Sequence, residues 1–222
     1  MRNLEVRDVG RVRFSEGYAL QRDLVSRRKQ GLIPDQLLLL EHPHVVTIGR
    51  NGHRENLLAS EEILQRSGIE LHATDRGGDV TYHGPGQLVG YPILDLKDWK
   101  RDVVAYVRAL EQVLIDTLAS FGIQGARLDG CTGVWVGPAK IAAIGVHLSR
   151  WVTSHGFALN IDTDLNYFNY IVPCGLTKPV TSLLDQGCHA SRAQVAAALL
   201  EHFANHFQFE SVQESCTMET IA

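Results

Sequence analysis

Apolar residues recur along the chain with two different periods, and together these periods predict both helices and strands. Steps of three and four residues indicate a helix over about 99–121, with Gly122 at its end. Helical patterns also cover 15–30, where Ser15 can cap the start, and about 191–207. Ser60, followed by two glutamates, predicts a short helix.

Short runs of β-forming residues predict strands at 36–41, 88–94, 140–148 and 152–161. The joint of residues 149–151 between the last two indicates an antiparallel hairpin. Helices interspersed with hairpins favour an α+β fold, in which helices flank a mixed or antiparallel β-sheet. We expect one domain over residues 1–213 and a frayed tail over 214–222.

Composition narrows the class of protein. Hydrophobic residues make up 45% of the chain and charged residues 21%, which is ordinary for a globular protein. The net charge of −4 offers no overall basic field for nucleic acid, although an acidic carrier protein would need a local basic patch. The N-terminus has no apolar core of a signal peptide, and the longest apolar run, 37–40, is too short to cross a bilayer. We therefore expect a cytoplasmic protein with no membrane association.

The four cysteines are Cys131, Cys174, Cys188 and Cys216. In a chain of this length they do not indicate a disulfide scaffold, and none forms a C-x-x-C pair. No metal site is expected, and Cys131, Cys188 and Cys216 are interpreted as structural.

A glycine-rich segment, 76–87, concentrates four glycines and a proline around polar side chains. Glycine permits positive φ and close backbone approach, so the amides near Gly77 and Gly78 could form an anion or oxyanion pocket. A plain hairpin turn explains the same composition equally well.

Cys174 and Lys140 are the candidate reactive pair. Cys174 stands between proline and glycine, a context typical of a turn with an exposed thiol. Lys140 opens an apolar strand, and a neighbouring ammonium would stabilise a thiolate. Taken singly, an inert cysteine and a strand-edge lysine are the better interpretations. His83 and His155 are candidates for proton transfer.

Several longer motifs resemble the lipoyl(octanoyl) transferase family. They cover most of residues 36–185 and comprise the stretches 76–92, 140–147, 151–162, 164–168, 173–176 and 181–183. Such a resemblance implies a fold similar to the catalytic domains of biotin and lipoate protein ligases. It also implies that Cys174 carries an acyl thioester and that Lys140 activates it.

The resemblance further implies a set of substrate-binding residues. These are Arg76, Gly77, Gly78, Asp79, Val80, Thr81, Tyr82, His83, Ala143, Ile144, Gly145, Gly156, Phe157 and Ala158. Outside that implication, the aspartate at position 79 itself looks like free variation.

The implied reaction moves an octanoyl group from octanoyl-acyl carrier protein to a lysine of lipoyl domains, as the first step of endogenous protein lipoylation. Acceptors would be the 2-oxoacid dehydrogenase complexes and the glycine cleavage H protein. No cofactor is expected, since phosphopantetheine arrives on the carrier.

Three alternatives stay open at this point. An ATP-dependent lipoate or biotin ligase would activate a free acid and need no nucleophilic cysteine. A non-catalytic acyl-protein binding module could keep the fold without the chemistry. A cysteine hydrolase would pass the acyl group to water.

Overall fold

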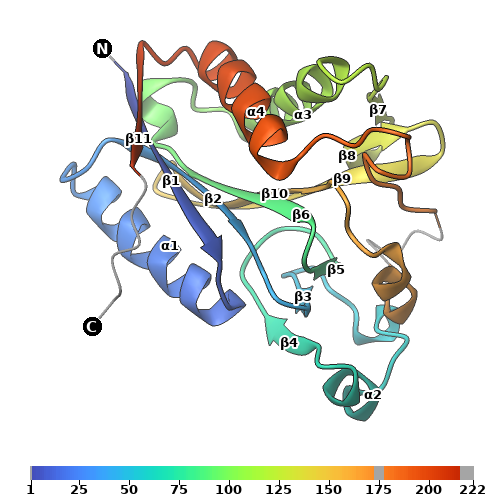
Figure 1. Cartoon of the computed structure of the whole chain (residues 1–222). Coiled ribbons are helices and arrows are strands. Elements are labelled where there is room, and N and C mark those ends of the chain that lie inside the picture. Colours follow the sequence, from blue (N-terminus) through green and yellow to red (C-terminus); the bar gives the residue numbers. More distant parts are fainter. Residues whose placement is uncertain (1, 173–177, 216–222) are drawn as a thin grey trace.

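A mixed eight-stranded sheet runs through the computed structural model, which describes residues 2–172 and 178–215 (Figure 1). Its strands are, in spatial order, β11 (Ser211–Ser215), β1 (Asn3–Arg11), β2 (Asp35–Glu41), β6 (Gln87–Ile93), β10 (Val152–Asn160), β9 (Ala139–Ser149), β8 (Cys131–Val136) and β7 (Ala126–Leu128). The first three strands run parallel and the other neighbours are antiparallel. The predicted α+β fold on a mixed sheet is confirmed.

Long helices cover both faces of this sheet (Figure 1). They are α1 (Phe14–Lys29), α3 (Val103–Ala119) and α4 (Arg192–Phe207). On one face Leu24 of α1 packs against Leu38 and Val89 of the sheet. On the other face Leu110 and Phe203, from α3 and α4, belong to the main core. None of the helices in the described residues is long and apolar enough to cross a membrane.

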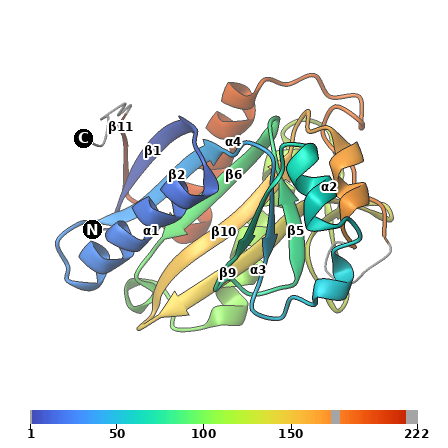
Figure 2. The ribbon, with the colours of Figure 1, turned by 90° about the horizontal axis from the view of Figure 1, so that it is seen from below.

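A smaller sheet, which the hydrophobic pattern did not predict, lies at the side of the molecule away from α1 (Figure 2). Its strands, in spatial order, are β4 (Glu70–Ala73), β3 (Val45–Ile48) and β5 (Val80–His83). The short helices are α2 (Glu61–Arg66) and the 3₁₀ segments η1 (Arg54–Asn56), η2 (Leu96–Asp98) and η3 (Leu165–Tyr170). Val46, Val80 and Tyr82 pack with Phe168 in a separate core cluster.

Capping side chains decide where the helices begin. The carboxylate of Asp102 accepts from the amide of Ala105, so α3 begins at Val103 and not near residue 99. The N-cap of α1 is Arg13, and the expectation for Ser15 is wrong. The helix start at Ser60 is confirmed, and Ser191, for which no cap was predicted, caps α4.

The C-terminal strand β11 was not predicted from the sequence, and it continues past residue 213. In β11, Glu214 lies opposite Val6 and Ser215 lies opposite Arg7 of β1. The predicted frayed tail therefore does not begin at residue 214.

The hairpin of β9 and β10 is confirmed. Arg150 and Trp151 at its turn have φ of 53° and 69°, the left-handed pair that a tight two-residue hairpin turn requires. β8 pairs with β9 only as far as Ala142, which leaves the rest of that edge to another partner. The glycine loop, residues 76–79, fills this position, and the amide of Gly77 donates to the carbonyl of Val146 at 2.9 Å.

Candidate active site

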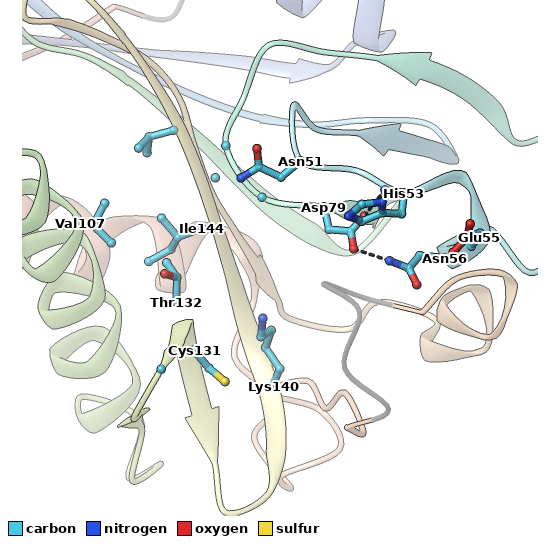
Figure 3. Close-up of a pocket in the computed structure, with 15 residues that line it drawn as sticks. Asn51, His53, Glu55, Asn56, Asp79, Val107, Cys131, Thr132, Lys140 and Ile144 are labelled. Atoms are coloured by element: carbon cyan, nitrogen blue, oxygen red, sulfur yellow. Dashed lines mark hydrogen bonds between the residues drawn. The ribbon is translucent and has the colours of Figure 1, made fainter.

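A cavity of about 810 Å³, the central cavity, lies between the glycine loop, β8 and β9 (Figure 3). It is lined by Asn51, His53, Glu55, Asn56, Gly77, Gly78, Asp79, Val107, Gly130, Cys131, Thr132, Lys140, Ile144, Gly145 and Val146. Charged and polar groups face one another across it, as reactions that develop charge require.

Lys140 enters the central cavity from β9. Its side chain is 7% exposed, and its ammonium lies over the ring of Trp135, 4.8 Å from the ring centroid. Beside the lysine, Gly133 has φ of 122°, and a Cβ there would lie 2.6 Å from the carbonyl oxygen of Ala142, so the close approach of β8 to β9 at this point requires glycine. The fold thus holds an ammonium at the wall of the cavity.

Cys174, the predicted nucleophile, lies outside the described residues. The chain on either side of it is attached to the central cavity. The amide of Val172 donates to the carbonyl of Asn56 at 2.7 Å, and the amide of Lys140 donates to the carbonyl of Pro179 at 2.9 Å. Both Asn56 and Lys140 line the cavity.

Arg76 shapes the glycine loop from within. Its buried guanidinium donates to the carbonyl of Thr47 at 2.7 Å, to the carbonyl of Asp79 at 2.8 Å and to the carbonyl of Gly77 at 3.0 Å. The same loop crosses β3 so closely that a Cβ on Gly49 would lie 2.3 Å from the carbonyl oxygen of Gly78. Among the residues predicted to bind substrate, Arg76 therefore acts mainly on the loop backbone.

The amide of Gly77 is not available for an oxyanion, because it already donates to Val146. That part of the expectation is wrong. The amides of Gly78 and Asp79 donate to no acceptor in the part of the chain that the structure describes. Gly78 is therefore the better oxyanion candidate of the pair.

Asp79 has a defined structural role in this chain, and the interpretation of this position as free variation within the family stays a prediction. Its carboxylate accepts from the amide of His53 at 3.0 Å and from that of Val80 at 2.8 Å. It also accepts from the side chain of Asn56, as the dashed line in Figure 3 marks. These bonds fasten the glycine loop to the polar wall of the central cavity.

A second, much narrower cavity of about 40 Å³, the inner slot, continues from the first past Gly78, Ile144 and Gly145, which line both. Its lining residues are Phe14, Arg76, Gly78, Thr81, His83, Tyr91, Ala143, Ile144, Gly145, His155, Gly156, Phe157 and Ala158.

The hairpin register brings two of the predicted binding stretches together. Gly156 lies opposite Gly145, Phe157 opposite Ile144, and Ala158 opposite Ala143. Residues that are distant along the sequence thus form one wall of the slot.

Val80 and Tyr82, which were predicted to bind substrate, line neither cavity. Successive side chains of a strand point to opposite faces, so Thr81 and His83 of β5 face the inner slot. Val80 and Tyr82 face the core cluster of the small sheet.

His83 lies fully buried at the slot. The carboxamide of Gln87 donates to the side chain of Asn160 at 2.9 Å, so its oxygen accepts from Nδ1–H of His83 at 2.7 Å. Burial, with a smaller contribution from the nearby His42, lowers the pKa of His83 to about 3. The ring is therefore neutral at physiological pH and a weak proton acceptor. Its proposed role in proton transfer stays a prediction.

His155 belongs to a different polar cluster. Its Nε2 lies 2.8 Å from the carboxylate of Asp75, which also accepts from the hydroxyl of Tyr18 at 3.0 Å. Burial lowers the pKa of His155, although the carboxylate favours the protonated ring. Asp75 precedes the glycine loop, so this cluster ties the loop to α1 and β10.

Sequence reasoning missed several residues of the central cavity. Asn51, His53 and Asn56 come from the chain after β3, and only the fold brings them to the site. Cys131, interpreted as structural, lines the cavity on the strand next to Lys140 (Figure 3). The sequence around Cys131 does not indicate that its thiol lines the same cavity as Lys140, because only the pairing of β8 with β9 brings the two strands together.

Comparison with known proteins identifies the family. Residues 14–204 match the model of the lipoyl protein ligase A/B catalytic domain. The chain belongs to this family. A protein of Solibacter usitatus named octanoyltransferase is 65% identical over 95% of this chain and 96% of its own length. Another octanoyltransferase, of Chloroflexus aurantiacus, is 46% identical over 98% of this chain and all of its own.

Solved structures agree on the fold. A bipartite lipoate protein ligase of Thermoplasma acidophilum superposes with a TM-score of 0.78 at 18% identity, covering 99% of this chain and 89% of that one. The biotin protein ligase of Aquifex aeolicus reaches a TM-score of 0.53 at 12% identity, covering 94% of this chain and 70% of its own. The expected similarity to biotin and lipoate ligase domains is confirmed.

Proposed function

We propose that this chain transfers an octanoyl group from octanoyl-acyl carrier protein to a lysine of a lipoyl domain, through a thioester on Cys174. The chain is an octanoyl-transferring enzyme of protein lipoylation, given 65% identity to an octanoyltransferase along nearly its whole length. The proposal adds the donor, the acceptor and the covalent route.

One observation carries the mechanism. The ammonium of Lys140 lies in a cavity to which the chain is attached at Val172 and Pro179, on both sides of Cys174. An ammonium near a cysteine stabilises the thiolate, which is the nucleophilic form. Lys140 therefore suits the activation of Cys174.

In the first half-reaction the thiolate of Cys174 attacks the carbonyl carbon of the octanoyl thioester. A new carbon–sulfur bond forms, and the bond to the carrier's pantetheine sulfur breaks. The departing sulfur takes the proton held by Lys140. The amide of Gly78 is our candidate to stabilise the oxyanion.

In the second half-reaction the neutral amine of the acceptor lysine attacks the acyl-cysteine. An amide forms, the bond to the Cys174 sulfur breaks, and the amine's proton passes to Lys140. Because one thioester replaces another in the first step, the route needs no ATP and no cofactor of its own.

The two cavities suit the two parts of the substrate. The thioester would lie in the polar central cavity, and the acyl chain would enter the inner slot past Gly78 and Gly145. The slot has room for only a few water-sized groups, so its side chains must move aside for eight carbons, as is common on binding.

We propose as acceptors the lipoyl domains of 2-oxoacid dehydrogenase complexes and the glycine cleavage H protein. The cytoplasm is the proposed location, and Cys131 and Cys188 are free thiols, as a reducing compartment favours.

The rival activities predict different products. An ATP-dependent ligase would need ATP and free octanoate, a hydrolase would release octanoate, and a binding module would leave the donor intact. Intact mass of the protein after incubation with octanoyl-acyl carrier protein, without ATP or acceptor, separates them. We expect a gain of one octanoyl group that is absent in Cys174→Ala. An unmodified mass beside unconsumed donor would overturn the covalent route.

A further inference from the structure

A third cavity, of about 260 Å³, lies between α1 and the turn of the β9–β10 hairpin; we call it the basic pocket. Arg22 and Lys29 reach it from α1, and Arg150 reaches it from the turn. None of the three forms an ion pair in residues 2–172 and 178–215. Three cations gathered around one cavity favour an anionic ligand, because their mutual repulsion is unfavourable without one.

Lys29 and Arg150 lie close enough for their charges to interact. Burial lowers the pKa of Lys29, and the nearby guanidinium of Arg150 lowers it further. The chain as a whole carries a net charge of −4, so this concentration of positive charge runs against the average. Guanidinium groups bind phosphate through two parallel hydrogen bonds, and lysine adds a point charge.

An unsatisfied donor lines the same cavity. Gln21 is only 1% exposed, and its oxygen accepts from the amide of His155 at 2.7 Å. Its Nε2 has no hydrogen-bond partner within the described chain. Buried polar atoms nearly always have a partner, so this N–H group calls for an acceptor from a ligand.

One carboxylate also lines the pocket. Asp75 is already engaged by Tyr18 and His155, and His147 lies 3.6 Å from its other oxygen. Three arginine and lysine charges against one aspartate leave the pocket net positive. The carboxylate therefore does not neutralise it.

We propose that the basic pocket binds a phosphate group, through Arg22, Lys29 and Arg150 and the Nε2–H of Gln21. Two sources share this chemistry, the phosphate on the donor's pantetheine arm and free inorganic phosphate. The first source rests on the proposed function, whereas the second does not. Asp75 borders the pocket and immediately precedes the glycine loop, which connects the basic pocket to the central cavity, whereas Arg150 and Lys140 lie at opposite ends of β9.

The first arm of the test measures binding without catalysis. Inorganic phosphate, compared with chloride at equal ionic strength, should raise the Tm of the wild type. The double variant Lys29→Gln/Arg150→Gln should lose this rise. Arg27→Gln is the matched control, since that arginine of α1 is 45% exposed, pairs with Asp23 and does not line the pocket.

The second arm compares octanoyl-4′-phosphopantetheine with octanoyl-pantetheine as donors. If the arm is the source, the wild type prefers the phosphorylated donor, and the double variant loses about tenfold in kcat/KM with that donor alone. Gln21→Glu keeps the acceptor for His155 but replaces the donor by a negative charge, and should abolish the same effects. The substitutions of Lys29 and Arg150 remain informative if that buried variant does not fold.

A Tm rise without donor preference identifies free phosphate as the ligand, and a donor preference lost in the double variant identifies the pantetheine arm. The proposal is overturned if the wild type shows neither effect, or if both persist in the double variant. Should the wild type accept neither donor, the proposed function fails, while the Tm measurement still decides the basic pocket.

Discussion

The central cavity and the inner slot meet at Gly78, Ile144 and Gly145, yet they offer opposite environments. The central cavity is wide and carries an ammonium, two carboxylates and a histidine at its walls. The slot is narrow, its buried His83 is held neutral, and the guanidinium of Arg76, which also lines it, is engaged by backbone carbonyls. The two cavities are separated where the backbone of the glycine loop passes β9.

This difference teaches how one site can recognise a chain and perform chemistry. Charges that develop during acyl transfer need charged and hydrogen-bonding groups close by. An alkyl chain gains free energy only where water and charge are excluded. Placing the glycine loop on the uncovered edge of β9 keeps the two environments adjacent but distinct.

The largest effect is expected when the ammonium of Lys140 is removed from the central cavity. Lys140→Met keeps the length of the side chain but not its ammonium, and we expect acyl-enzyme formation to slow about a thousandfold. Lys178→Met is the matched control, because its ammonium also lies over Trp135 but does not line the cavity. Rapid-quench mass spectrometry measures both rates. A rate for Lys140→Met close to that of the control would contradict the role.

The next effect concerns the slot alone. Ala143→Leu fills space beside Ala158 and should favour shorter acyl chains. Each methylene contributes about 0.8 kcal/mol, so the kcat/KM ratio of octanoyl to hexanoyl donors should fall about fifteenfold. Thr132→Val, in the central cavity, should leave that ratio unchanged. An unaltered ratio in Ala143→Leu would show that the acyl chain does not lie beside Ala143 in the inner slot.

The pH dependence of the free energy of unfolding tests whether the inner slot excludes a charged His83. The folded pKa of His83, about 3, lies below the ordinary 6.5, so the unfolded chain binds more protons between these values. Stability is therefore lost as pH falls from 6.5 toward 3, by about 2 kcal/mol between pH 7 and pH 5 from this histidine.

In His83→Gln that part of the loss should disappear, whatever the variant's stability at pH 7. Urea unfolding at the two pH values measures it. The exposed His189→Gln should keep the wild-type loss. Equal losses in wild type and His83→Gln would show that the slot tolerates a charge.

The smallest effect concerns the ring beneath Lys140. Trp135→Leu removes a cation–π contact and should slow acylation about fivefold, whereas Trp135→Phe retains a ring and should slow it less. Tm values of both variants separate this effect from lost packing. Equal acylation rates in the two variants would show that an aromatic ring at position 135 does not contribute to acylation.

Long periodic segments made much of the fold predictable. The helices α1, α3 and α4 and the β9–β10 hairpin follow from patterns that extend over many residues. The strands of the small sheet are four residues long, too short for an alternation to stand out. The predicted start of α3 was wrong because a local capping side chain, Asp102, decides where the helix begins.

The site was predictable in its motifs but not in its contacts. The stretches 143–145 and 156–158 face each other because of the β9–β10 hairpin, which was predicted, and its register, which was not. Asp79 could not be understood from its neighbours, because its partners His53 and Asn56 come from another part of the chain. Likewise, Arg150 of the basic pocket is more than a hundred residues from Arg22 and Lys29 along the chain.

The pairing of β11 with β1 has a consequence for synthesis of the chain. Strand β1 is made first, but its outer neighbour consists of residues 211–215. Until those residues leave the ribosome, one side of β1 presents unpaired backbone groups, which can template association with other chains. A nascent chain halted before residue 211 is therefore exposed to aggregation at this edge.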